Sequence, residues 1–168
     1  MTLDELNAID AAGFVAALGG VFEHSPWVAE AALAKRPFAR VEELHRAMVE
    51  AVASAGEERQ LALIRAHPEL AGKVAVRGEL TADSRQEQSG AGLTQCSPQE
   101  FARLNELNRA YNAKFGFPFI IAVKGLDRAA IIARFAQRIE HDRSTEFREA
   151  LEQIARIARL RLDAMLAG

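Results

Sequence analysis

The chain has 168 residues, 49% of them apolar and 26% charged, which is enough apolar material for one ordinary hydrophobic core. Its net charge of −2 argues against a nucleic-acid or anionic-membrane surface, and its one cysteine excludes an internal disulfide. The acidic start lacks a signal-peptide pattern, and no apolar run approaches the roughly 18 residues of a membrane span. The length suits one domain, or at most two very small ones. We expect a single cytoplasmic domain over residues 1–168, with neither nucleic acid nor membrane as a partner.

The first 67 residues are rich in alanine, leucine, glutamate and arginine, which favour helix. Helices are predicted from Thr2, with Glu5 completing a capping box; from about Ala11 to Gly19–Gly20; from an N-cap at Ser25 with Pro26 at the first helical position to before Pro37; from Val41 to Ala55; and from Glu57 to His67. Because Pro68 disfavours helical geometry in the residue before it, His67 is expected at a helix end.

The remainder begins with an expected loop over residues 69–80. Helices are then predicted from Thr81 to about Gly90; from Ser97–Pro98 to Phe115 with Phe101, Leu104, Leu107, Tyr111 and Phe115 inward; from Asp127 to about His141; and from Ser144 or Thr145 to about Ala164. Residues 117–123 are continuously apolar, are flanked by helix breakers and have no second strand candidate, which predicts a buried extended segment. The prediction is an all-α, single-domain bundle of about eight to nine helices.

The last predicted helix carries an arginine on its apolar face. At about 100° per residue its apolar stripe contains Arg161, whereas Arg156 and Arg159 point away. The apolar members of the stripe are Phe147, Leu151, Ile154, Ala158 and Met165. An arginine in this position forms an ion pair, snorkels to solvent, or offers its planar donor fork to a carboxylate or urea-like ligand.

Two further positions carry polar chemistry. Ser84, Glu87 and Gln88 are three and four residues apart, so a helix presents their hydroxyl, carboxylate and amide on one face. This face could bind a small polar ligand, or it could be a solvated first turn, since Arg85 and Gln86 are polar too. His67 is suited to proton transfer near neutral pH, although histidine is also common at helix ends.

Motifs for bound cofactors are missing from the sequence. The four histidines show no His-x-x-x-His spacing, and a single cysteine cannot form Cys-x-x-Cys, so a metal site is not expected. There is also no Gly-x-Gly-x-x-Gly, no Walker loop and no Gly-x-Ser-x-Gly. We therefore expect neither a metal nor a nucleotide cofactor.

Three separated sequence blocks, taken together, resemble those of a known protein family. They are the run from His67 to Lys73, the pattern Ser84-x-x-Glu87-Gln88-x-x-Ala91-Gly92-Leu93, and the pattern Leu104-Asn105-x-x-Asn108-x-x-Tyr111-x-x-Lys114-Phe115-Gly116-Phe117-Pro118-Phe119-Ile120. In this order the blocks resemble the OHCU decarboxylase family, where OHCU is 2-oxo-4-hydroxy-4-carboxy-5-ureidoimidazoline, a product of urate oxidation and hydrolysis. The resemblance covers essentially the whole chain.

The resemblance implies an all-helical, cofactor-free and usually homodimeric enzyme that converts OHCU to (S)-allantoin and carbon dioxide. It implies His67 and Glu87 as the catalytic residues. It implies substrate contacts at Pro68, Ser84, Arg85, Gln86, Glu87, Gln88, the main chain of Phe119, Ile120, Ile121, Ala122 and Val123, and Arg161.

Two other classes of function fit parts of the sequence. A helical interaction module would explain the amphipathic helices and the missing cofactor motifs, but not an arginine centred on an apolar stripe. A metal-dependent hydrolase would require a ligand set for which no motif is present. The sequence does not assign the group that delivers the final proton in a decarboxylation.

Overall fold

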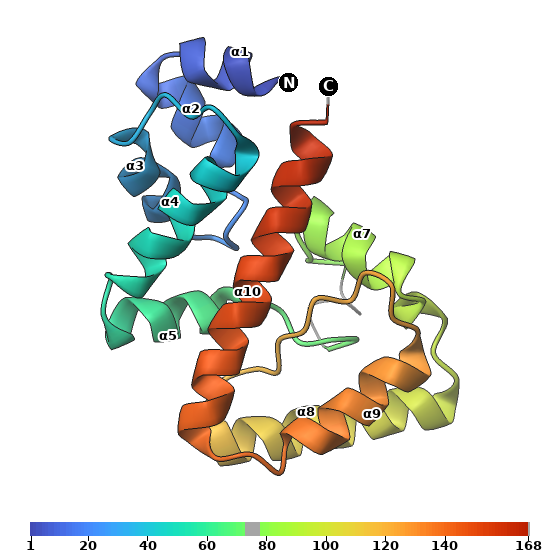
Figure 1. Ribbon diagram of the computed structural model, residues 1–168. Coiled ribbons are helices and arrows are strands. Elements are labelled where there is room, and N and C mark those ends of the chain that lie inside the picture. Colours follow the sequence, from blue (N-terminus) through green and yellow to red (C-terminus); the bar gives the residue numbers. More distant parts are fainter. Residues whose placement is uncertain (73–77, 168) are drawn as a thin grey trace. The chain divides into compact units, whose positions relative to one another are not determined.

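The computed structural model describes residues 1–72 and 78–167. Within these ranges the chain forms nine α-helices and one 3-10 helix and contains no strand (Figure 1). The predicted all-α class and helix number are therefore confirmed. Residues 73–77, in the middle of the predicted loop over residues 69–80, lie outside the described residues.

The chain divides into two compact units. One consists of Met1–Ala66 with Ile154–Gly168, and the other of His67–Gln153. The longest helix, α10 (Arg143–Met165), contributes residues to both units. That the chain behaves as a single domain stays a prediction.

The first unit contains five complete helices and the second half of α10. The helices are α1 (Leu3–Ala8), α2 (Ala11–Leu18), α3 (Trp27–Leu33), α4 (Val41–Ala53) and α5 (Glu57–Ala66). Thr2 and Glu5 form the predicted capping box of α1. The buried core of this unit includes Leu6, Phe14, Phe22, Val28, Leu44, Met48, Leu63, Ile64, Ile154 and Leu162.

The predicted start of α3 is wrong by one residue. The helix begins at Trp27, and Pro26 is the capping residue, with no side-chain cap. The Ser25 hydroxyl donates backwards to the Glu23 carbonyl oxygen at 2.9 Å. Because serine hydroxyls compete for nearby backbone groups, Ser25 closes the preceding turn instead of capping the helix.

The second unit contains α7 (Ala82–Gly90), the 3-10 helix η1 (Leu93–Gln95), α8 (Pro98–Phe115), α9 (Arg128–Arg138) and the first half of α10. The predicted N-caps Thr81, Ser97 and Asp127 are confirmed. The predicted start of α10 is wrong: the helix begins at Arg143, because Asp142 Oδ1 accepts from the Thr145 main-chain N–H at 2.7 Å.

Residues 117–123 form the predicted extended segment after α8, and all of them except the half-buried Ala122 are buried. Gly116 ends α8 in the left-handed conformation, with φ of 78°. Phe119 stacks on Phe135 of α9 with ring centroids 3.9 Å apart, and Tyr111 of α8 meets both rings edge-on. By contrast, Phe101 is 39% exposed, so its predicted inward orientation is wrong. It lies in the first turn of α8, ahead of the first buried residue of that helix, Leu104.

Candidate active site

His67 follows the last residue of α5 and is 7% exposed. The helix ends where Pro68 requires it to end, as the sequence predicts. The imidazole is therefore attached to a turn instead of a helix, and the geometry of that turn decides where the ring lies.

Amide side chains hold the main chain that follows His67. The Gln88 Oε1 atom accepts from the Ala71 N–H at 3.0 Å, and its Nε2 atom donates to the Glu69 carbonyl at 3.3 Å. Asn108 Nδ2 donates to the Leu70 carbonyl at 3.0 Å. Ala71 has a φ of 49°, a left-handed conformation that a non-glycine residue adopts only when its surroundings impose it. Three consecutive residues of this turn are therefore fixed by side chains.

A second asparagine, Asn112, extends this support along α8. Its Nδ2 atom donates to the Glu69 carboxylate and, at 2.9 Å, to the Asn108 carbonyl. Neither asparagine was singled out as a site residue from the sequence. The available signal was their spacing, because side chains four residues apart project from the same side of a helix.

The predicted polar face of α7 is present. Ser84 and Gln88 are 4% and 5% exposed and Glu87 is half-buried, whereas Arg85 and Gln86 are exposed. Since Gln88 bonds to the turn after His67, this face lies against that turn. The structure therefore brings the first and second sequence blocks together within one unit. Because Ser84 and Gln88 are buried, the alternative interpretation of this face as a solvated first turn is wrong.

Two side chains already bind the main chain of the extended segment over residues 117–123. Arg138 Nη1 donates to the Ile120 carbonyl at 2.6 Å, and Gln153 Oε1 accepts from the Ala122 N–H at 2.9 Å. Two of the main-chain groups predicted to contact substrate, the Ile120 carbonyl and the Ala122 N–H, are therefore already bonded to side chains. Sequence reasoning missed Arg138, although it follows Ile131 and Phe135 on the buried face of α9, the pattern that drew attention to Arg161.

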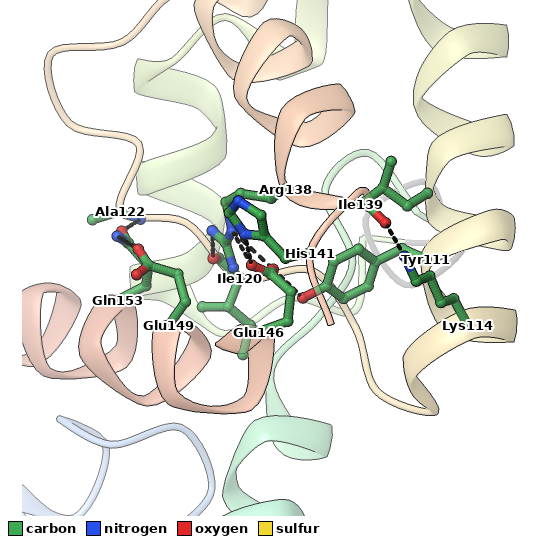
Figure 2. Close-up of polar contacts among 10 residues, drawn as sticks. All are labelled: Tyr111, Lys114, Ile120, Ala122, Arg138, Ile139, His141, Glu146, Glu149 and Gln153. Atoms are coloured by element: carbon green, nitrogen blue, oxygen red, sulfur yellow. Dashed lines mark hydrogen bonds and ion pairs between the residues drawn. The ribbon is translucent and has the colours of Figure 1, made fainter. Parts of the chain in front are cut away.

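A buried carboxylate, Glu146, anchors Arg138. Glu146 is fully buried and accepts from Arg138 Nε at 2.9 Å and from the Tyr111 hydroxyl at 2.6 Å, with His141 Nδ1 3.0 Å away (Figure 2). Burial, and then the neighbouring Glu146 carboxylate, raise the pKa of Tyr111 well above its ordinary value. Tyr111 therefore remains a protonated donor at neutral pH.

Arg161 lies on the buried face of α10 in the first unit and is 8% exposed. Its Nη1 atom is 2.8 Å from Glu23 Oε2, and the same atom donates to the Gly20 carbonyl at 3.2 Å. Of the interpretations open from the sequence, the structural ion pair is therefore correct for the Nη1 atom of Arg161. The predicted stripe is slightly rotated: Ile154 and Ala158 are buried as expected, whereas Phe147, Leu151 and Met165 are only half-buried.

Further features bear on the other classes of function. In residues 1–72 and 78–167, no three or more His, Cys, Asp or Glu side chains gather where they could hold a metal ion. Cys96 donates to the Leu93 carbonyl, and burial raises the pKa of its thiol, so it is a poor nucleophile at neutral pH. No helix in the described part of the chain is long and apolar enough to cross a membrane.

A buried imidazole, a half-buried carboxylate and fixed amide groups on a helical scaffold are the parts expected of an acid–base enzyme. Residues 7–163 match the OHCU decarboxylase family, and the chain belongs to that family. The predicted resemblance is confirmed, and it favours a decarboxylase over a helical interaction module.

Relatives match over nearly all of this chain. The 2-oxo-4-hydroxy-4-carboxy-5-ureidoimidazoline decarboxylase of Haloferax volcanii is 46% identical over 162 residues, covering 96% of this chain and 94% of the relative. The decarboxylase of the same name from Mus musculus is 37% identical, covering all of this chain and 94% of the relative. A uric acid degradation bifunctional protein of Bacillus subtilis is 44% identical and covers 96% of this chain, which corresponds to 32% of that longer protein.

Solved structures agree with this assignment. A crystal structure of (S)-allantoin synthase superposes with a TM-score of 0.78 at 31% identity, covering 99% of this chain and 54% of that chain. A crystal structure of OHCU decarboxylase in the presence of (S)-allantoin gives a TM-score of 0.71 over 95% of this chain and 100% of that chain. The second match is 21% identical and supports the fold alone.

Proposed function

We propose that this protein is the decarboxylase that converts OHCU to (S)-allantoin and carbon dioxide during urate degradation. The observation that carries the proposal is the match to the OHCU decarboxylase family over residues 7–163, together with a decarboxylase 46% identical over almost its full length. The buried His67 turn and the polar face of α7 against it are consistent with acid–base chemistry at this site.

The chemistry of OHCU makes a cofactor-free reaction reasonable. The departing carboxylate is attached to a carbon next to a C=N bond, which can accept the electron pair left behind when carbon dioxide departs. Pyridoxal phosphate and thiamine diphosphate provide such an electron sink for other substrates, but here the substrate carries its own. The protein has to orient the breaking bond, move protons, and let only one face of the ring be protonated.

In this proposal His67 engages the hydroxyl and carboxylate region of OHCU, and Glu87 holds the substrate and assists the proton transfers. Arg161 provides guanidinium donors for carbonyl or ureido oxygens. Gln88 acts mainly through the turn after His67, since its amide already bonds to Glu69 and Ala71. The remaining substrate contacts come from Pro68, from Ser84, Arg85 and Gln86, and from the main chain of residues 119–123.

The finer features of the family belong to the proposal as well. We propose a cytoplasmic homodimer of single-domain subunits that works without metal or cofactor. Sedimentation equilibrium of the purified protein tests the dimer, and a monomer at working concentrations would contradict it. Turnover unchanged by chelators, with no metal found by elemental analysis, tests the cofactor-free reaction.

The decisive experiment uses fresh substrate. OHCU is generated in place from urate by a urate oxidase and a hydroxyisourate hydrolase, this protein is added, and optical activity is followed. Spontaneous decay of OHCU gives racemic allantoin, so rapid formation of one enantiomer is the expected result. Optical activity no greater than in the enzyme-free control would reject the proposed function.

A further inference from the structure

We propose that Arg138 and Gln153 are positioning residues that aim the main-chain N–H and C=O of Ile121 at a ureido or cyclic-amide group of the substrate. The inference rests on the proposed function and adds two residues, on α9 and α10, that no sequence motif assigned to the site. Figure 2 shows both side chains reaching the extended segment.

The two side chains bind the main-chain groups on either side of Ile121. Arg138 Nη1 donates to the Ile120 carbonyl oxygen at 2.6 Å. Gln153 Oε1 accepts from the Ala122 N–H at 2.9 Å. The Gln153 Nε2 atom donates to Glu149 Oε1 at 2.8 Å, which fixes the end of the amide that faces Ala122.

This arrangement leaves the polar groups of Ile121 for another partner. In extended chain the N–H and C=O of one residue point to the same side, and those of its neighbours point to the opposite side. The groups of Ile121 therefore point away from those held by Arg138 and Gln153. Within residues 1–72 and 78–167 neither group of Ile121 has a hydrogen-bond partner, although the residue is only 5% exposed. Buried main-chain groups are nearly always paired, so a bound molecule is the expected partner.

The two anchors also make Ile121 a stronger binding group. The Ile120 carbonyl and the Ile121 N–H belong to one peptide unit, and a charged donor on the carbonyl polarises the unit so that its N–H donates more strongly. The Ala122 N–H and the Ile121 carbonyl form the next unit, and the acceptor supplied by Gln153 makes that carbonyl a better acceptor. Ureido and cyclic-amide groups carry an acceptor and a donor close together, and thus complement this pair.

Stability alone does not explain the buried guanidinium. Arg138 is 7% exposed, and its Nη2 atom is buried without a partner in the described part of the chain. A buried ion pair such as Arg138–Glu146 typically contributes little more than well-packed apolar residues would. The ion pair with Glu146 and the Phe119 ring, whose centroid is 4.3 Å from the guanidinium carbon, instead hold the guanidinium against the Ile120 carbonyl.

The test compares Arg138→Lys and Gln153→Met with exposed control substitutions on the same two helices, Arg134→Lys and Glu152→Gln. Lysine keeps the charge but cannot bond to Glu146 and Ile120 with one planar group. Methionine is similar in size to glutamine but cannot accept from Ala122. We expect each of these two variants to raise KM for OHCU about tenfold, which corresponds to about 1.4 kcal/mol, with kcat changed less than about threefold.

Binding of (S)-allantoin, measured by calorimetry, should weaken by a similar factor, while both controls match wild type. A purely structural role would lower thermal stability and the active fraction without this shift in KM. An unchanged KM in folded Arg138→Lys and Gln153→Met would overturn the proposal. If Arg138→Lys does not fold, the KM of Gln153→Met alone tests the proposal. Wild-type enzyme that forms no (S)-allantoin would instead reject the underlying function, so the two failures are distinguishable.

Discussion

Arg161 Nη1 lies 2.8 Å from Glu23 Oε2, and both residues are buried. Because the same amine also reaches the Gly20 and Val21 carbonyls, Glu23 and this turn hold one side of the guanidinium. The ion-pair interpretation of Arg161 is therefore correct, and its substrate-binding role stays a prediction. An anchored guanidinium loses less conformational entropy when it binds a ligand than a mobile one would.

Replacing Arg161 with lysine is expected to weaken substrate binding. Lysine keeps the positive charge and can still pair with Glu23, but it loses the planar donor fork that suits carbonyl and ureido oxygens. We expect KM for OHCU to rise about tenfold or more, the equivalent of about 1.4 kcal/mol. The matched control is Arg156→Lys on the exposed side of α10. An unchanged KM in Arg161→Lys would remove Arg161 from the substrate site.

The partner substitution, Glu23→Gln, is expected to act first on stability. It leaves the Arg161 charge buried without its carboxylate, and breaking a buried pair in this way typically costs about 3–5 kcal/mol. Urea unfolding measures the loss. Glu30→Gln, which changes an exposed carboxylate on α3, should leave the free energy of unfolding within about 0.5 kcal/mol of wild type. A similarly small effect of Glu23→Gln would show that the pair is not needed for folding.

Features with a local cause were predictable from the sequence. The capping box at Thr2, the helix start at Ser97 and the helix end before Pro68 depend on residues within one turn, and all three are observed. The polar face of α7 was predictable for the same reason, since a helix brings residues three and four apart together.

Pairings between distant residues were not predictable in this way. Gln88 bonds to main chain 17 residues away, and Arg138 bonds to a carbonyl 18 residues away. Nothing in the helix period specifies such partners, because they depend on how the helices pack. Arg161 could be recognised as unusual on its stripe, but its partner Glu23 is 138 residues distant in the chain.

The His67→Asn substitution tests proton transfer at the centre of the proposed site. Asparagine keeps hydrogen-bonding capacity but cannot carry a proton at neutral pH, so we expect kcat to fall about 100- to 10,000-fold. Initial rates of (S)-allantoin formation from fresh OHCU measure the effect. The control is His24→Asn, because His24 is exposed and has a φ of 48°, a conformation that asparagine also adopts readily. Near-wild-type turnover of the His67 variant would exclude the residue from proton transfer.

Gln88 is predicted to support catalysis through the turn after His67. Gln88→Met removes the bonds to Ala71 and Glu69, so buried main-chain groups lose their partners at a cost of about 1–3 kcal/mol. We expect reduced stability together with a lower kcat, because the turn that positions the imidazole is no longer held. Ser89→Ala, an exposed change on the same helix, is the control. A destabilised Gln88→Met variant with wild-type kcat would contradict the prediction, because it would show that the turn after His67 is not needed for catalysis.

Tyr111 predicts how stability depends on alkaline pH. Its pKa is raised in the folded protein by burial and by the Glu146 carboxylate, whereas an unfolded tyrosine loses its proton near pH 10, roughly its ordinary value. Above that pH the folded state holds one more proton than the unfolded state. The contribution of Tyr111 to the free energy of unfolding, fully present below about pH 10, should therefore fall by up to about 1.4 kcal/mol per pH unit as the pH rises.

The comparison with Tyr111→Phe isolates this effect from other groups that titrate at high pH. Near pH 8 the variant should be less stable by about 1–2 kcal/mol, because Glu146 loses a hydrogen bond, and the difference should shrink above about pH 10. Tyr111 is the one tyrosine in the chain, so tyrosinate absorbance reports on this residue alone. We expect that absorbance to appear together with loss of helical circular dichroism. Tyrosinate forming near pH 10 in protein that remains helical would contradict the buried hydrogen bond from Tyr111 to Glu146, because a phenol held there has to stay protonated until the fold opens.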